Sequence, residues 1–118
     1  MRNVKLFENV LASNTQTSIE INLPMRTEWI LRVNSSSLNG TPKIYIEEGF
    51  GSGKTPPNQY DWNVLPNKCS DSDAFDITDS EVRIRSNHFV ANWFRIRLEP
   101  NENTSGIMTV ILSYKDYV

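Results

Sequence analysis

Apolar and polar residues alternate one by one along most of this chain, and this period of two constrains its fold more than any other feature. In residues 28–34, Trp29, Leu31 and Val33 share one face of the alternating pattern. The alternation recurs, less regularly in the first segment, at residues 4–12, 17–23, 42–48, 81–86, 93–99 and 106–115. Because successive side chains of a strand point to opposite faces, each segment is predicted to be a β-strand with one buried face. The helical period of 3.6 residues is almost absent.

Clusters of turn-forming residues separate these segments. They occupy Asn14–Gln16, Ser35–Gly40, Gly49–Asn58, Pro66–Asp73 and Pro100–Gly106. Short strands at this spacing, with no helical segment between them, are typical of antiparallel sandwiches and jelly rolls. The 118 residues are enough for one hydrophobic core. We therefore predict one all-β domain over residues 1–118, a jelly-roll-like antiparallel β-sandwich of about eight short strands.

The composition is that of a soluble globular domain, with 38% hydrophobic and 22% charged residues. A net charge of −2 argues against nucleic acid as a partner. Cys69 is the single cysteine and has no internal disulfide partner. No apolar run approaches the roughly 18 residues of a membrane helix, so no membrane partner is expected. Glu8 and Asn9 interrupt any signal-peptide core, and we expect the chain to be retained without export.

The stretch GFGSGKTPPN, residues 49–58, resembles a phosphate-binding loop because it contains Gly-Lys-Thr. The phosphate-binding pattern requires a glycine at position 48, where this chain has Glu48. The lysine and threonine of a true phosphate loop also begin a helix, whereas Pro56 and Pro57 follow Thr55 here. We therefore predict a glycine-rich connection between two strands, and no bound cofactor.

Two further groups of residues are candidates for a catalytic or metal site. His88, the single histidine, lies in a predicted turn with no nucleophile motif around it, so an exposed or capping role is favoured. Carboxylates cluster at Asp71, Asp73, Asp76, Asp79 and Glu81. Such a cluster is compatible with calcium, but its register does not fit a helix–loop–helix calcium motif. The favoured alternative is that these Asp and Ser side chains cap turns.

Four arginines mark the candidate partner-binding surface. Arg83 and Arg85 lie on one predicted strand and Arg95 and Arg97 on the next, so they are expected to share the outward face of a hairpin-like pair. Guanidinium groups gathered on one surface bind carboxylates or phosphates of a partner. A solvated face balanced by nearby glutamates is the alternative, and the pattern does not separate the two.

The aromatic residues add one member to this surface. Trp29 and Trp62 are predicted to fill the core. Trp93 alternates with the apolar face of its strand and is therefore expected to point outward beside Arg95. Exposed tryptophan next to arginine is typical of protein-binding surfaces. Together with Tyr45 and Tyr60, these tryptophans also allow a platform on which sugars stack.

The order of the segments resembles that of small β-sandwich proteins of tailed bacteriophage particles. The resemblance runs from Lys5 to Lys115 and rests on KLFENVLASNTQTSIEINL, TEWILRVN, TPKIYIEEG, YDWNVLP and NWFRIRLEPNENTSGIMTVILSYK. In that group, a strand ending in a turn of the type VEGS-D-G---W precedes a closing motif of the type RL----N-SG-ITV. The turn after Glu48 is enlarged here, which suggests a loop with a contact of its own.

This resemblance implies a virion structural protein without an active site: a capsid auxiliary or decoration protein, or a head–tail component. Its partners would be other virion proteins, as a homo-oligomer or bound to a lattice, in virions assembled in the host cytoplasm. A carbohydrate-binding adhesion module is the alternative, motivated by the sandwich, Trp93 and the aspartate-rich segment. A small hydrolase using His88 with Asp76 or Asp79 is the third hypothesis and is ranked last.

Overall fold

A computed structural model of the chain describes residues 2–23, 28–67, 72–78, 80–85 and 91–115. The strands are β1 (Arg2–Leu11), β2 (Gln16–Thr17), β3 (Ile21–Asn22), β4 (Trp29–Ser36), β5 (Lys43–Gly49), β6 (Trp62–Val64), β7 (Phe75–Asp76), β8 (Glu81–Arg85), β9 (Trp93–Glu99) and β10 (Ile107–Tyr114). Within these ranges no helix is long and apolar enough to cross a membrane.

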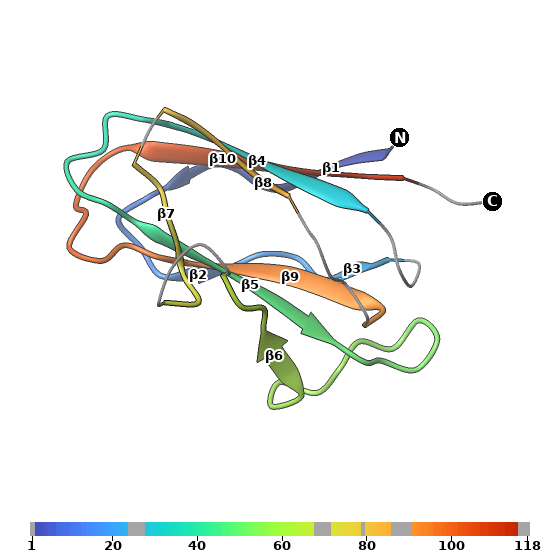
Figure 1. The fold of residues 1–118 in the computed structure, drawn as a ribbon. Coiled ribbons are helices and arrows are strands. Elements are labelled where there is room, and N and C mark those ends of the chain that lie inside the picture. The colour runs from blue at the N-terminus through green and yellow to red at the C-terminus, as the bar shows by residue number, and fades with distance from the viewer. Residues whose placement is uncertain (1, 24–27, 68–71, 79, 86–90, 116–118) are drawn as a thin grey trace.

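The strands form two antiparallel sheets that stack face to face (Figure 1). The first sheet has the order β1-β10-β4-β8, and the second has the order β2-β9-β5-β6, with β3 also on β9 and β7 also on β5. If β2 with β3 and β6 with β7 are each counted as one interrupted strand, the domain has eight strands in jelly-roll order. The predicted sandwich is confirmed.

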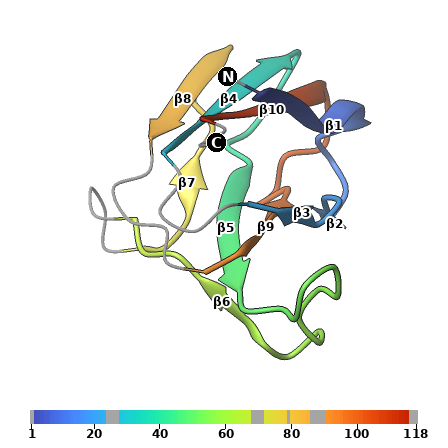
Figure 2. The same cartoon turned by 90° about the vertical axis from the view of Figure 1, so that its right-hand side faces the viewer.

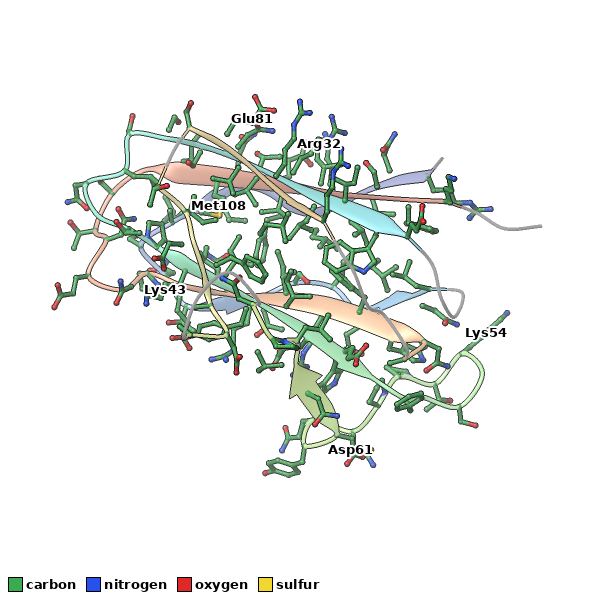
Figure 3. The ribbon with its side chains drawn as sticks, in the orientation of Figure 1. Arg32, Lys43, Lys54, Asp61, Glu81 and Met108 are labelled. Carbon is green, nitrogen blue, oxygen red and sulfur yellow. The ribbon has the colours of Figure 1, made fainter. Side chains whose placement is uncertain are left out.

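The core consists of the apolar faces that the alternation predicted. Its fully buried residues from the central strands are Leu31, Val33, Ile44, Ile46, Phe94, Ile96, Leu98, Met108, Val110 and Leu112. Met108 is seen between the two layers in Figure 3. Trp29 packs edge-on against Phe94 with ring centroids 5.0 Å apart, so the prediction of a core Trp29 is confirmed. Residues from both sheets therefore interlock in one layer of side chains.

The segment predicted as a strand over residues 17–23 is interrupted in the structure. Ser18 turns its hydroxyl inward, where Oγ accepts a 2.9 Å hydrogen bond from the backbone N–H of Ile96. This bond shifts the alternation, so Ile19 is exposed rather than buried beside Leu23. Alternation over residues 17–23 predicts Ile19 on the apolar face together with Leu23. This prediction is wrong, because the Ser18 side chain turns inward and bonds to the neighbouring strand.

One end of the sandwich is held by the buried side chain of Asn103. Its Oδ1 accepts hydrogen bonds of 3.0 Å from the backbone N–H groups of Asn39 and Gly40. Its Nδ2 donates to the carbonyl oxygens of Ala12 at 3.0 Å and Ser105 at 2.7 Å. Asn103 thus joins the chain after β1, the β4–β5 connection and the β9–β10 connection, all of which lie far apart in sequence.

Candidate partner-binding surfaces

The four predicted arginines do not share a surface. Strand β8, with Arg83 and Arg85, pairs with β4 in the first sheet, whereas β9, with Arg95 and Arg97, pairs with β5 in the second. Strands β8 and β9 lie in opposite sheets (Figure 2), so the two pairs of outward-facing arginines lie on opposite outer faces of the sandwich. The expected hairpin-like pair is wrong because strands adjacent in sequence join different sheets in this topology.

Arg95 is held by protein groups on the outer face of the second sheet. Its Nε donates a 2.9 Å hydrogen bond to Oε1 of Glu47, directly across the ladder on β5. The guanidinium carbon lies 4.2 Å from the ring centroid of Trp62, in a cation–π contact, and Nη1 is 4.0 Å from a carboxylate oxygen of Glu20. The side chains of Arg95 and Glu47 are only 16% and 9% exposed. This pair is a structural element rather than a free binding group.

Arg97 is partnered in a similar but more exposed way. Its guanidinium lies 4.5 Å from the ring centroid of Tyr45, and it forms an ion pair with Glu99 on the same strand. About a third of each charged side chain is accessible to solvent. Both arginines of β9 therefore pair with neighbouring glutamates. This is the arrangement that the alternative of a solvated face balanced by glutamates predicts for β9.

Trp93 and Trp62 depart from their predicted environments in opposite ways. Trp93 does point outward from the second sheet, but it is only 7% exposed because the backbone at Gly51 covers it. Trp62 is buried outside the core cluster, on the same outer face, beneath Arg95. The prediction of an exposed Trp93 is wrong, and so is that of a core Trp62. The connection after β5 covers Trp93 at Gly51, whereas Arg95 of β9 covers Trp62, and no local sequence pattern reveals either contact.

We call residues 50–61 the aromatic loop. It projects beyond the second sheet between β5 and β6 (Figure 1). Its two ends carry Phe50 and Tyr60, which are 65% and 88% exposed. No other large hydrophobic side chains of the described chain are as exposed as these two. The loop therefore presents two aromatic side chains to solvent, and at Gly51 it packs on the buried Trp93.

The glycine-rich part of the aromatic loop forms a tight turn. Ser52 and Thr55 exchange two backbone hydrogen bonds, of 3.0 and 2.8 Å, and Gly53 between them has a φ of 58°. Lys54 lies at the outer end of this turn (Figure 3). The chain from residue 49 to residue 67 contains no helix, so Thr55 does not begin the helix that a phosphate loop uses to hold its ligand. The segment is a connection between strands, as predicted.

Replacing Gly51 by alanine is expected to dislodge the aromatic loop. An added Cβ would lie 2.3 Å from both the carbonyl oxygen of Thr55 and Nε1 of Trp93, far inside contact distance. Overpacking of this kind costs about 1–3 kcal/mol. We expect a lower Tm and a red-shifted, more readily quenched tryptophan fluorescence. Gly53→Asn is the control, because nothing lies within 4 Å of a Cβ there and Asn tolerates the left-handed backbone. Unchanged fluorescence in Gly51→Ala would show that the loop does not pack on Trp93.

The outer face of the first sheet carries a second group of cations, which we call the basic face. It consists of Lys5, Arg32, Arg83 and Arg85, on β1, β4 and β8. Sequence reasoning identified the two arginines of β8 but missed Lys5 and Arg32. The available signal was that Arg32 alternates with the buried Leu31 and Val33, which places it on the same side of β4 as Ile30 and Asn34. Figure 3 shows Arg32 pointing away from the core, near Glu81.

The remaining candidates are only partly described. His88, Cys69, Asp71 and Asp79 lie outside the described residues. In the described part of the aspartate-rich segment, Asp76 lies 3.7 Å from Nζ of Lys43, and Ser72 accepts a hydrogen bond of 3.1 Å from the N–H of Ala74. The second contact is the turn-capping role that was favoured. No three potential metal-ligating side chains gather among the described residues.

Comparison of the chain with protein-family models, with curated proteins and with solved structures finds no match. The proposals below therefore rest on the residues and their geometry, together with the sequence resemblance described above.

Proposed function

We propose that this protein is a non-enzymatic structural component of a bacteriophage virion, which binds other virion proteins through the aromatic loop. The observation that carries the binding role is the exposure of Phe50 and Tyr60, at 65% and 88%, on a loop whose base packs over Trp93. The resemblance to phage sandwich proteins supplies the setting, as a capsid auxiliary or decoration protein or a head–tail component.

Exposed aromatic side chains are suited to this role because they bury a large area with little loss of rotamer entropy on binding. In a symmetric particle the same contact repeats, so a modest affinity at each loop becomes strong attachment when several subunits engage together. The packing of Gly51 on the buried Trp93 restricts the loop before binding, so less conformational freedom is lost when a partner binds. The loop is thus a preorganised contact rather than a free tail.

The carbohydrate-binding alternative was motivated by the sandwich, an exposed Trp93 and the aspartate-rich segment. Trp93 is covered by the loop, so it is not available for stacking on a sugar, and a glycan is kept only as an outcome of the test. An immobilised glycan panel that binds the protein through Tyr60 would replace the proposed function.

Replacing both exposed aromatic residues, Phe50→Ser with Tyr60→Ser, is expected to abolish particle binding without unfolding the protein. Both side chains are mostly in solvent, so stability is expected to change by about 0.5 kcal/mol or less. Tagged variants should be compared for co-sedimentation with particles of the phage that encodes the chain, and for oligomeric state by light scattering.

Leu11→Ser with Ile19→Ser is the matched control, because it also removes two exposed apolar side chains, each 57% exposed, from other parts of the surface. We expect this control to bind as the unmodified protein does. Equal binding by the aromatic variant and the control would reject the aromatic loop as the contact. Absence of binding by the unmodified protein would reject the virion role itself.

A further inference from the structure

The basic face is a compact arrangement set by strand register. Lys5 is aligned with Ile111, Ile111 with Arg32, and Arg32 with Arg83, so these residues form one row across the four strands of the first sheet. Neighbouring strands lie about 4.8 Å apart. Arg85 follows Arg83 on the same face of β8 and is aligned with Ile30. Three guanidinium groups therefore gather over β4 and β8.

The charges of the basic face are not balanced by the described residues around it. Lys5 pairs with Glu8 at 2.9 Å, and Arg83 pairs with Glu81 at 3.1 Å, in both cases between side chains more than half exposed. Such exposed pairs contribute little and exchange readily with other partners. Arg32 and Arg85 have no ion-pair partner among the described residues. Arg32 also faces Arg83 directly, and like charges directly opposite on a sheet repel each other.

We propose that the basic face is a second docking surface, which binds a protein surface or segment presenting glutamate and aspartate carboxylates. A carboxylate placed between Arg32 and Arg83 would offset their repulsion and accept paired hydrogen bonds from a guanidinium group. In an extended segment, alternate side chains on one face are spaced about 7 Å apart, which matches the spacing of Arg83 and Arg85 on β8. A strand with acidic residues at alternate positions fits this geometry.

A protein fits better than a nucleic acid. The basic face has four cations with two nearby glutamates and part-buried isoleucines, Ile30 and Ile111, aligned beside the arginines. Mixed apolar and arginine-rich surfaces are typical of protein interfaces, whereas nucleic acid binding requires a denser excess of positive charge. The whole chain has a net charge of −2, which also argues against nucleic acid as the partner.

The basic face and the aromatic loop lie on opposite sides of the sandwich (Figure 2). A protein with contacts on both sides is able to bridge two partners in a particle. This inference rests on the proposed function, because both take the partner to be another protein. The basic face is tested with a peptide and the aromatic loop with particles. A negative result for one surface is therefore distinguishable from a negative result for the other.

The probe is a short fluorescent peptide in which glutamate alternates with threonine, with a glutamine version as its control, and binding is measured by fluorescence anisotropy. We expect binding of the glutamate peptide alone, and weaker binding when salt rises from about 50 to 300 mM. Arg32→Gln with Arg85→Gln is expected to lower the affinity about tenfold or more. Lys5→Gln with Arg83→Gln provides an independent second variant, expected to act in the same direction.

Lys43→Gln with Lys54→Gln is the matched control, because it removes the same charge from the other side of the molecule (Figure 3). We expect its affinity to stay within about twofold of the unmodified protein. Three results would overturn the proposal: no binding of the glutamate peptide at low salt, an equal loss in the control variant, or a DNA duplex that binds at least as tightly as the peptide. The last result would make the face a nucleic-acid surface.

Discussion

Arg95→Ala is expected to destabilise the protein by about 3–4 kcal/mol, because it leaves the carboxylate of Glu47 buried without its partner. The Arg95–Glu47 hydrogen bond of 2.9 Å joins side chains that are 16% and 9% exposed, so little solvent is available to replace the lost guanidinium group. The variant also loses the cation–π contact with Trp62. Urea unfolding followed by far-ultraviolet circular dichroism measures the change.

The double replacement Arg95→Met with Glu47→Leu distinguishes a lost partner from lost packing. Removing both charges leaves no buried carboxylate, so we expect most of the stability to return. Arg97→Ala is the matched control on the same strand, since its ion pair with Glu99 is about one-third exposed and is worth about 1 kcal/mol or less. Equal effects of Arg95→Ala and Arg97→Ala would show that the buried pair does not hold this face together.

The burial of Arg95 makes its replacement unsuitable as a test of partner binding. Arg95 and Trp93 were both expected to contact a partner, but Arg95 is covered by neighbouring groups of the second sheet and Trp93 by the aromatic loop. Loss of binding after their replacement would therefore report on folding. Phe50, Tyr60, Arg32 and Arg85 are the informative positions for binding, because none of their side chains forms a hydrogen bond or ion pair within the described chain.

Asn103→Ala is expected to cost about 3 kcal/mol or more, because it removes four hydrogen bonds at one buried point. The backbone N–H groups of Asn39 and Gly40 and the carbonyl of Ala12 would lose their partner in a region where the side chain is only 2% exposed. For a domain of this size we expect a fall in Tm of about 10 °C. Scanning calorimetry measures this change.

Asn22→Ala serves as the control for Asn103. It removes a single exposed hydrogen bond, of 3.2 Å to the carbonyl of Gly53, and is expected to cost about 0.5 kcal/mol or less. Asn103→Asp separates the contributions of Oδ1 and Nδ2 to stability. It keeps the acceptor for Asn39 and Gly40 but loses the donor to Ala12 and Ser105. A Tm for Asn103→Ala within a degree or so of the control would contradict the central role of this residue.

The sequence identified most of the core correctly. In β4, β5, β9 and β10 the residues predicted on the apolar face are buried, from Trp29 in β4 to Leu112 in β10. Alternation predicts burial because it is a local property: a strand with one apolar face gains free energy by covering that face, whichever strand covers it. Ile19 is an exception: it is exposed, because the hydroxyl of its neighbour Ser18 turns inward and bonds to a strand that lies far away in sequence.

The candidate site was predicted less well, for a reason visible in β8 and β9. The outward direction of Arg83, Arg85, Arg95 and Arg97 follows from alternation and is correct, but their grouping depends on which strands pair. Asn103 was not recognised at all, because a polar residue in a turn-rich segment gives no local sign that it is buried. The closing motif in which it lies, N-SG, was the only signal present.

The sequence by itself therefore determined that the chain is all-β and which side chains of the central strands face the core, because burial follows from a repeat that each strand carries within itself. The tertiary structure alone decided that Arg32 joins Arg83 on one face, that Glu47 neutralises Arg95 on the other, and that the aromatic loop covers Trp93. Each of these contacts joins residues distant in sequence, and only the order of strands in the two sheets brings them within reach of one another.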